Sequence, residues 1–365
     1  MSAERTRQTV RPTNGGNEGL RIAPNSRIPD GAPPANSVQG LVESTMHSCS
    51  VLIASYKRPQ QLSRCLEGLA RQTRRADELV VIWQSEDEAT RDLALSFGPA
   101  FHESLRTVHC QQAGIVPALN SGLRHAIGEI VVLIDDDAIA PGDWLEKHLR
   151  HYADPTIGAV GGPALNHFGD GQRFPVRQVR QIGKLLWHGK MVGYLNDGLP
   201  AQSCRTLLAV DVLAGNNMSL RRRAFSRFDD NLKDYWQYFE VEACQQVKLR
   251  GFGVVFDFSN PVFHYPASTN KVYDGSRDGD INQKFYAAAY NHAYTLSKYT
   301  NGLLRVIRFL YLITTSSVPY PGPIKYLIAV FRYGNPSREF HIMLSVLRGH
   351  YMGWRDGKSA QVKKT

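Results

Sequence analysis

Features that mark secreted, disulfide-rich and membrane-spanning proteins are scarce in this sequence of 365 residues. The five cysteines are odd in number and form no Cys-x-x-Cys pair, which argues against a disulfide framework or a zinc site and favours a reducing compartment. The first 40 residues lack the apolar run of a signal peptide. The longest uncharged stretch, residues 309–324, is shorter than the ~20 residues of a spanning helix and contains three prolines. We therefore expect a cytoplasmic protein without a transmembrane helix.

Aromatic side chains are absent from residues 1–45, which hold five prolines and five glycines. Such a segment buries too little apolar surface to offset the entropy lost in ordering its backbone. We therefore predict a flexible N-terminal tail; an ordered arm lying on the body is the alternative. The whole chain has 42% hydrophobic and 21% charged residues, a globular composition that excludes general disorder and rod-like folds.

Beyond residue 45, short apolar runs alternate with segments of helical periodicity. The apolar runs predict strands at 50–54, 78–83, 106–110, 129–134, 157–162 and 253–258. The helical spacing predicts a helix after Pro59 and further helices at 89–97, 115–127 and 238–250. Strands and helices that alternate in this way indicate an α/β fold with a parallel sheet, an architecture typical of nucleotide-binding proteins.

Three consecutive aspartates, Asp135, Asp136 and Asp137, directly follow the most hydrophobic predicted strand. Carboxylates at this spacing repel one another, so the folded chain must compensate their charge, and a divalent cation with oxygen ligands does so. Ligands of open α/β sheets bind at the carboxyl ends of strands, which is where these residues stand. The pattern therefore indicates a metal site; an acidic turn before a helix that starts near Asp143 is the alternative.

Five motifs, in order between residues 50 and 264, resemble family 2 glycosyltransferases. They are Val-Leu-Ile-Ala-Ser-Tyr-Lys-Arg-Pro at 51–59, Ala-Gly-x-x-x-Ala-Leu-Asn-x-Gly at 113–122, the acidic motif at 135–137, Pro-x-x-Trp-Leu at 141–145, and the Ala-Gly-Asn-Asn segment within 211–222. The resemblance implies a GT-A fold over residues 46–270, with a mostly parallel sheet and helices on both faces. It also implies a nucleoside-diphosphate sugar as the donor. Beyond the resemblance, the charge and helical spacing of residues 271–365 predict a basic helical C-terminal region.

The same resemblance assigns metal binding to the acidic motif. It implies that Asp137 binds Mg²⁺ or Mn²⁺, while Asp135 or Asp136 reaches the ribose. His264 is implied as a further metal ligand, and a packed or surface histidine is the alternative. A bound divalent ion would act as a Lewis acid that neutralises the charge of the departing nucleoside diphosphate.

A catalytic base is expected at the start of the helix that ends at Gly251. By resemblance, Glu240 occupies the position of the second acid of the family's acidic pair, and Phe239 replaces the first. Glu240 is therefore the expected base, and Glu242 is the second candidate. A helix N-terminus favours the ionised carboxylate by about 0.3–1 kcal/mol, so that the carboxylate can accept the proton of the acceptor hydroxyl. Two solvated glutamates on an exposed helix are the alternative.

This sequence departs from the family at the end of the second strand. The expected acidic pair, which contacts the nucleotide base, is replaced by Trp83 and Gln84. Asp87 or Glu86 would then take that role, and Trp83 can belong to the core. The other implied pocket residues are Ser55, Tyr56 and Arg58 around the nucleotide, Asn120 beside it, and Asn216 and Asn217 on sugar hydroxyls, with helix packing or a simple turn as alternatives for the asparagines.

The formal net charge of +10 is concentrated near the C-terminus, because residues 291–365 contain eleven Lys or Arg and only two acids. The helical pattern there separates an apolar face from a cationic one. A helix of this kind can lie in a lipid interface with its cations at anionic headgroups, and a lipid-linked acceptor would explain such a contact. A helix packed on the protein's own core is the alternative. The apolar face comprises Leu303, Ile307, Leu310 and Tyr311, and the cationic face comprises Lys298, Arg305 and Arg308.

Together these inferences predict an inverting, metal-dependent glycosyltransferase at the inner face of a membrane. Its acceptor would be a hydroxyl of a lipid-linked glycan or of a surface polysaccharide precursor. A nucleotidyltransferase on a similar fold is one alternative, but residues 54–59 lack the glycines of a phosphate-binding loop. A non-catalytic basic module that binds membrane or nucleic acid is another, and the near-neutral charge before residue 291 argues against nucleic acid.

Overall fold

The computed structural model describes residues 47–167, 177–179, 181–193, 198–200, 206–233, 238–266, 280–315, 322–333 and 336–361. All of these residues belong to one compact unit. The predicted tail at 1–45 and the predicted domain boundary at residue 270 lie outside the described residues.

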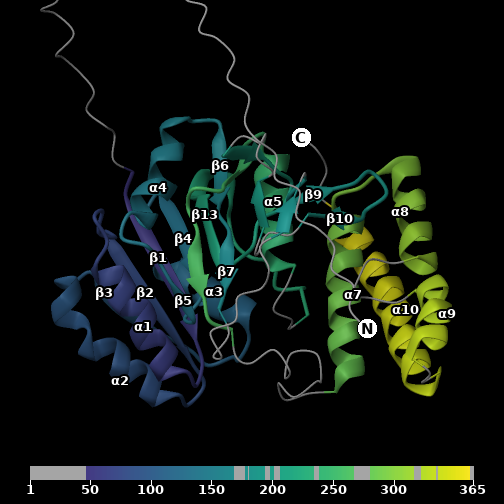
Figure 1. Cartoon of the computed structure of the whole chain (residues 1–365), viewed down its shortest axis with the longest axis horizontal. Coiled ribbons are helices and arrows are strands. Elements are labelled where there is room, and N and C mark those ends of the chain that lie inside the picture. Colours follow the sequence, from purple (N-terminus) through teal and green to yellow (C-terminus); the bar gives the residue numbers. More distant parts are fainter. Residues whose placement is uncertain are drawn as a thin grey trace, which may run out of the picture. The chain divides into compact units, whose positions relative to one another are not determined.

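An eight-stranded sheet forms the centre of this unit (Figure 1). Its strands, in spatial order, are β12 (Leu207–Ala209), β14 (Gly253–Asp257), β6 (Ile157–Gly161), β13 (Asn217–Arg221), β4 (Ile130–Ile134), β1 (Cys49–Ser55), β2 (Glu78–Gln84) and β3 (Leu105–Cys110). Strands β4, β1, β2 and β3 are parallel, as are β14 and β6. Strand β13 runs antiparallel to both of its neighbours, and β12 runs antiparallel to β14. The predicted mostly parallel sheet is confirmed.

Helices cover both faces of the sheet. They are α1 (Pro59–Ala70), α2 (Glu88–Ser96), α3 (Ile115–His125), α4 (Trp144–Arg150) and α5 (Phe239–Leu249), with short 3₁₀ helices at Gly98–Phe101, His151–Ala153 and Arg222–Ala224. Leu52 of β1 packs in one apolar cluster with α3 and α5, whereas Val51 and Ile53 pack in another with α1, α2 and α4. The strand therefore buries both of its faces, as its continuous apolar run predicted.

One predicted helix ends earlier than expected. Helix α3 stops at His125, because Ala126 adopts extended backbone and the amide of Ile127 donates to the side chain of Glu78. Ile127 is therefore exposed instead of extending the buried face of the helix, so the prediction of a helix over 115–127 is wrong at its last two residues.

Several short strands lie outside the main sheet. A three-stranded sheet has the order β5 (Ala138–Ile139), β15 (Val262–His264), β7 (Ala164–Asn166). Two further pairs are β9 (Lys184–Leu185) with β10 (Met191–Val192), and β8 (Arg177–Val179) with β11 (Gly198–Pro200). The three-stranded sheet matters for the site, because it places His264 opposite Ala138, one residue beyond the acidic motif.

Four helices follow the sheet in the chain: α7 (Ile281–Lys298), α8 (Gly302–Thr314), α9 (Pro323–Tyr333) and α10 (Pro336–Ser359). They lie on the right of Figure 1, on the side of α5. Three glycines of α10, Gly349, Gly353 and Gly357, face the backbone of α7 and permit its close approach. No helix in the described part of the chain is both long and apolar enough to cross a membrane. The predicted helical C-terminal region is confirmed.

We predict that Gly353→Ala destabilises the protein, although alanine favours a helix interior by about 1 kcal/mol over glycine. A Cβ at this position would overlap the carbonyl oxygen of Tyr290 in α7, and a backbone atom cannot move aside as a flexible side chain can. We expect the free energy of unfolding to fall by about 1–3 kcal/mol in urea denaturation. The control is Gly98→Ala, where a Cβ meets no atom within 4 Å. Equal stability of the two variants would contradict the close packing of α7 and α10.

Candidate active site

The three aspartates lie at the carboxyl end of β4, next to the carboxyl end of β1. Ser55, the last residue of β1, donates a hydrogen bond from Oγ to Oδ2 of Asp136 at 2.7 Å. Arg58, just before α1, pairs with two carboxylates: its Nη2 lies 2.9 Å from Oδ1 of Asp136, and its Nη1 lies 2.8 Å from Oδ2 of Asp137. These contacts compensate part of the repulsion among the consecutive carboxylates.

The aspartates differ in their exposure. Asp136 is fully buried, and burial raises its pKa to about 7 against the lowering effect of Arg58. Asp137 is also buried, whereas the side chain of Asp135 is partly exposed. Asp136 therefore anchors Ser55 and Arg58 inside the protein. Of the two aspartates predicted to reach a ribose, Asp135 is the accessible one.

His264 joins this cluster from β15. Its Nε2 lies 3.0 Å from Oδ1 of Asp137 and 3.9 Å from Oδ2 of Asp135. Its Nδ1 lies 2.7 Å from Oδ1 of Asn166 on the neighbouring strand β7. Burial lowers the pKa of His264, but the hydrogen bond to Asp137 and the negative charges of Asp137 and Asp135 together outweigh it, so the net shift of the pKa is upward. The imidazole is thus fixed at both nitrogens.

This set of donors suits a divalent cation. The ligand atoms of Asp135, Asp137 and His264 lie within 4.8 Å of one another. Two carboxylates with one imidazole form a mixed oxygen and nitrogen set that Mn²⁺ and related ions accept. When Nδ1 of His264 donates to Asn166, Nε2 is left as the ligand atom, an arrangement common among metal-binding histidines. The three residues can therefore hold a divalent metal ion.

Glu240 lies in the first turn of α5. The preceding Tyr238 has a left-handed backbone with φ of 82°, and a Cβ at Gly215 would overlap the ring of Phe239, so the start of the helix is tightly constrained. Oε2 of Glu240 is buried and accepts no hydrogen bond within the described residues. Burial raises the pKa of Glu240 to about 8, and the negative charge of Asp135 adds to the rise. Glu240 therefore belongs to the electrostatic environment of the aspartates.

Glu242 has a different environment. It is fully buried, and its Oε1 accepts hydrogen bonds from Lys298 Nζ at 2.7 Å and from Tyr299 Oη at 2.6 Å. Its Oε2 accepts from Gln246 at 2.8 Å. Oε1 thus holds α5 against the end of α7, while Oε2 is engaged by a residue of α5 itself.

The two asparagines of the Ala-Gly-Asn-Asn segment also differ. Asn217 pairs with Ile134 in the antiparallel register of β13 and β4, which puts Asn216 level with Asp135. Oδ1 of Asn216 is buried and has no hydrogen-bond partner among the described residues. Asn217 is fully engaged: its Oδ1 accepts from Trp144 and lies 2.9 Å from His148 Nε2, and its Nδ2 donates to the carbonyls of Pro163 and Asn260. Asn216 is therefore the one with capacity to contact a ligand.

The other predicted pocket residues differ in their contacts. Asp87 caps α2 and accepts a hydrogen bond from the amide of Lys57, which ties α2 to the loop after β1. Asn120 is buried, and its amide group bonds to both backbone groups of Phe228 and to Asp230. These contacts favour a role for Asn120 in helix packing, which was the alternative to its predicted place beside the nucleotide. Tyr56 is exposed beside Lys57.

Three contacts near the site were not anticipated from the sequence. Asn166, which orients His264, lies in a short strand without a motif, and only the pairing of β7 with β15 reveals it. Trp83 stacks on His109 of β3 with ring centroids 4.1 Å apart, and the neighbouring Gln84 accepts from the amide of Gly114. Trp83 is thus half-buried between strands, and no sequence pattern indicated its partner.

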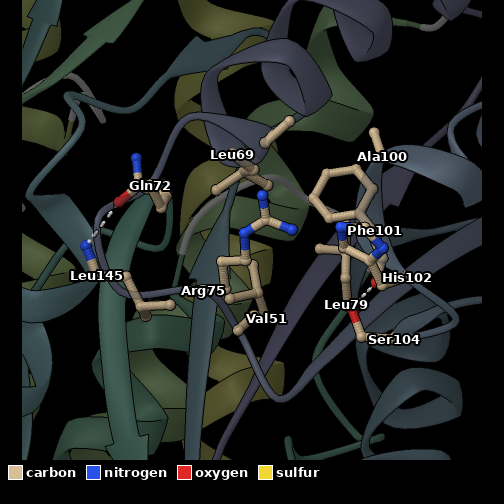
Figure 2. A pocket seen from close by; sticks show the side chains of 12 residues that line it. Val51, Leu69, Gln72, Arg75, Leu79, Ala100, Phe101, His102, Ser104 and Leu145 are labelled. Atoms are coloured by element: carbon tan, nitrogen blue, oxygen red, sulfur yellow. Dashed lines mark hydrogen bonds between the residues drawn. The ribbon is translucent and has the colours of Figure 1, made fainter.

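A pocket of about 210 Å³ lies at the opposite ends of the strands (Figure 2). Its mostly apolar lining includes Leu79 and Phe101 near the amino ends of β2 and β3, with Gln72 after α1. Gln72 is held there by the amide of Leu145. Because Ser55 and Asp135 lie at the carboxyl ends, this pocket is not part of the acidic cluster.

Comparison with known proteins agrees with this geometry. Residues 50–228 match the family described as glycosyl transferase family 2. Glycosyltransferase AglE of Haloferax volcanii is 26% identical over 121 residues, which cover 33% of this chain and 40% of that protein. Succinoglycan biosynthesis protein ExoM of Rhizobium meliloti is 30% identical over 128 residues, which cover 34% of this chain and 41% of that protein. The chain thus spans about two fifths of the length of these relatives, and both Glu240 and His264 lie beyond the family match.

Among solved structures, GalNAc-T7 in complex with UDP, GalNAc and Mn²⁺ is similar in fold. It superposes with a TM-score of 0.55 at 14% sequence identity, over 82% of this chain and 57% of that one. This likeness concerns the fold alone. The ordered motifs and the family match lead to one conclusion: residues 50–228 of this chain form a domain of the glycosyl transferase family 2 type.

Proposed function

We propose that this protein transfers a sugar from a nucleoside-diphosphate sugar to a hydroxyl acceptor, with a divalent metal ion and with inversion at the anomeric carbon. The observation that carries the proposal is the cluster of Asp135, Asp137 and His264, with Glu240 in the same electrostatic environment. The family match supports the activity. The name of ExoM, a protein of succinoglycan biosynthesis, supports a polysaccharide precursor as the acceptor.

We propose that Asp135, Asp137 and His264 hold Mn²⁺ or Mg²⁺. When bound, the ion supplies Lewis-acid stabilisation of the departing diphosphate. Arg58 binds Oδ2 of Asp137, which leaves Oδ1 directed at His264. The presence of Mn²⁺ with UDP in the GalNAc-T7 complex is consistent with such an ion.

Glu240 is our candidate for the catalytic base. Its carboxylate would accept the proton of the acceptor hydroxyl while the oxygen forms a bond to the anomeric carbon and the bond to the diphosphate breaks. Attack from the face opposite the leaving group gives inversion. Glu242 lacks the capacity for this step, because Lys298, Tyr299 and Gln246 already occupy both of its oxygens.

The acceptor is proposed to be lipid-linked, and the protein to act at the inner face of a membrane. Leu303 and Leu310 on α8 are exposed, as a contact with lipid would require. Asn216, whose Oδ1 lacks a hydrogen-bond donor among the described residues, is a candidate contact for a sugar hydroxyl.

The metal site can be tested by direct binding. Asp137→Asn should weaken Mn²⁺ binding at least tenfold, because it removes a charged ligand, and should lower metal-dependent hydrolysis of a nucleotide sugar in parallel. Binding can be followed by electron paramagnetic resonance of free Mn²⁺. Asp143→Asn is the matched control, since that exposed carboxylate pairs with Lys147. Unchanged Mn²⁺ affinity in Asp137→Asn would remove the site assignment.

The base assignment predicts opposite behaviour for two neighbouring glutamates. Glu240→Gln should lower kcat of transfer by about 10²–10⁴-fold while Mn²⁺ affinity and stability are retained. Glu242→Gln should instead lower the free energy of unfolding by about 1–3 kcal/mol, because Lys298 and Tyr299 lose a charged partner. Steady-state kinetics and urea denaturation separate the two effects. If Glu242→Gln lost transfer with full stability, Glu242 would be the base.

The activity should also depend on pH. Burial raises the pKa of Glu240 to about 8, so the carboxylate that accepts a proton forms only as pH rises through that region. We expect kcat/KM to increase with pH in this range. Saturating Mg²⁺ should move the rise to lower pH, because a cation near Asp135 favours the ionised form. A pH profile with the same shape in Glu240→Gln would contradict this role.

A further inference from the structure

Helix α8 directs its apolar side chains outward and its cations inward. Leu303, Val306 and Leu310 share one helical face and are exposed, Leu303 to 75%. On the opposite side, Arg305 donates to the carbonyl and the hydroxyl of Ser297. This arrangement reverses that of an ordinary surface helix, which buries its apolar face and solvates its charges.

The second arginine of α8 is held in the same way. Arg308 donates from Nε to the carbonyl of Trp187 at 2.8 Å and from Nη1 to Oγ1 of Thr300 at 2.5 Å. Burial lowers the pKa of both arginines. Lys298, at the end of α7, pairs with Asp229 and Glu242 inside the protein. The three cations expected to reach lipid headgroups are therefore engaged by protein groups, and what α8 offers outward is its apolar face.

Helix α9 repeats the pattern. Ile324, Leu327, Ile328 and Phe331 follow the i, i+3, i+4, i+7 spacing of one helical face, and all four are exposed, Phe331 to 90%. Of the sixteen large apolar side chains exposed in the described part of the chain, eleven lie on α8, α9 and α10. Apolar side chains concentrated in this way mark an interaction surface.

The two helices belong to one region of the surface. Gly322, just before α9, lies so close to the last turn of α8 that a Cβ would be 2.8 Å from the carbonyl oxygen of Thr314. Figure 1 shows both helices on the side of the helical region away from the sheet. Their outward side chains can therefore meet one partner.

Positively charged side chains beside the exposed apolar side chains of α8 and α9 indicate the kind of partner. Lys190 is exposed near Lys325 of α9, and burial together with the charge of Lys190 lowers the pKa of Lys325. No described carboxylate forms an ion pair with either lysine. Trp187, 64% exposed between β9 and β10, lies beside α8, because the adjacent His188 contacts the ring of Tyr311. Apolar side chains flanked by lysines and a tryptophan complement an anionic lipid surface.

We propose that the outward face of α8 and α9 docks on an anionic membrane by inserting its apolar side chains, with Lys190 and Lys325 at the headgroups. This apolar face comprises Leu303, Leu310, Ile324, Leu327, Ile328 and Phe331. The inference deepens the proposed function and rests on it for its purpose, since a lipid-linked acceptor is reached at the membrane. Binding to the membrane itself depends only on the outward face of α8 and α9.

The test is flotation of the full-length protein with vesicles of phosphatidylcholine and phosphatidylglycerol. The double variant Leu327→Glu/Phe331→Glu should bind at least tenfold more weakly than the unaltered protein. The matched control is Leu95→Glu, on α2, where an apolar side chain exposed to 54% is likewise exchanged for an acid. The control should float as the unaltered protein does. Lys190→Gln/Lys325→Gln should weaken binding at low salt and have little effect at high salt.

Three outcomes would overturn the docking proposal. They are failure of the unaltered protein to float, equal flotation of the Leu327→Glu/Phe331→Glu variant, and a dimer in sedimentation velocity that this variant converts to a monomer. Metal-dependent hydrolysis of a nucleotide sugar, measured without vesicles, should be equal in all variants. Loss of flotation with retained hydrolysis would support docking, whereas absence of hydrolysis in every protein would count against the proposed function alone.

Discussion

Arg58 neutralises two of three consecutive aspartates, and the site depends on this double ion pair. Asp136 is fully buried and would otherwise carry an uncompensated charge in the core. Because β1 and β4 are adjacent and parallel, the last residue of β1 and the loop after it place Ser55 and Arg58 at the end of β4. The anchored Asp136 then leaves its neighbours, Asp135 and Asp137, directed toward His264.

Helix α5 connects this cluster to the C-terminal helices. Glu240 and Glu242 are two residues apart, which on an α-helix places them roughly 200° apart around the axis. One side of the helix therefore turns Glu240 to the charge of Asp135, and the other turns Glu242 to Lys298 and Tyr299. The end of α7 thus fixes the orientation of the helix that carries the proposed base, so the C-terminal helices support the site as well as the surface.

The C-terminal helices also carry the surface that we propose docks on a membrane. Arg305 and Arg308 stabilise the packing of α8 from inside, through Ser297, Thr300 and the carbonyl of Trp187. With the cations used in this way, the apolar face is free to meet a lipid surface. The packing of α8 on the protein and the proposed membrane contact are therefore two consequences of the orientation of α8.

The sequence by itself determined most strands of the main sheet, most helix positions, the resemblance to family 2 glycosyltransferases and the place of the three aspartates, because apolar periodicity and short motifs are local properties. The tertiary structure decided what each polar side chain contacts. Asn120 and Phe228 are 108 residues apart, and Glu242 and Lys298 are 56 apart, so no local pattern could pair them. Likewise, spacing separates the two faces of α8, but only the packing of α7 and α10 decides which face meets the protein.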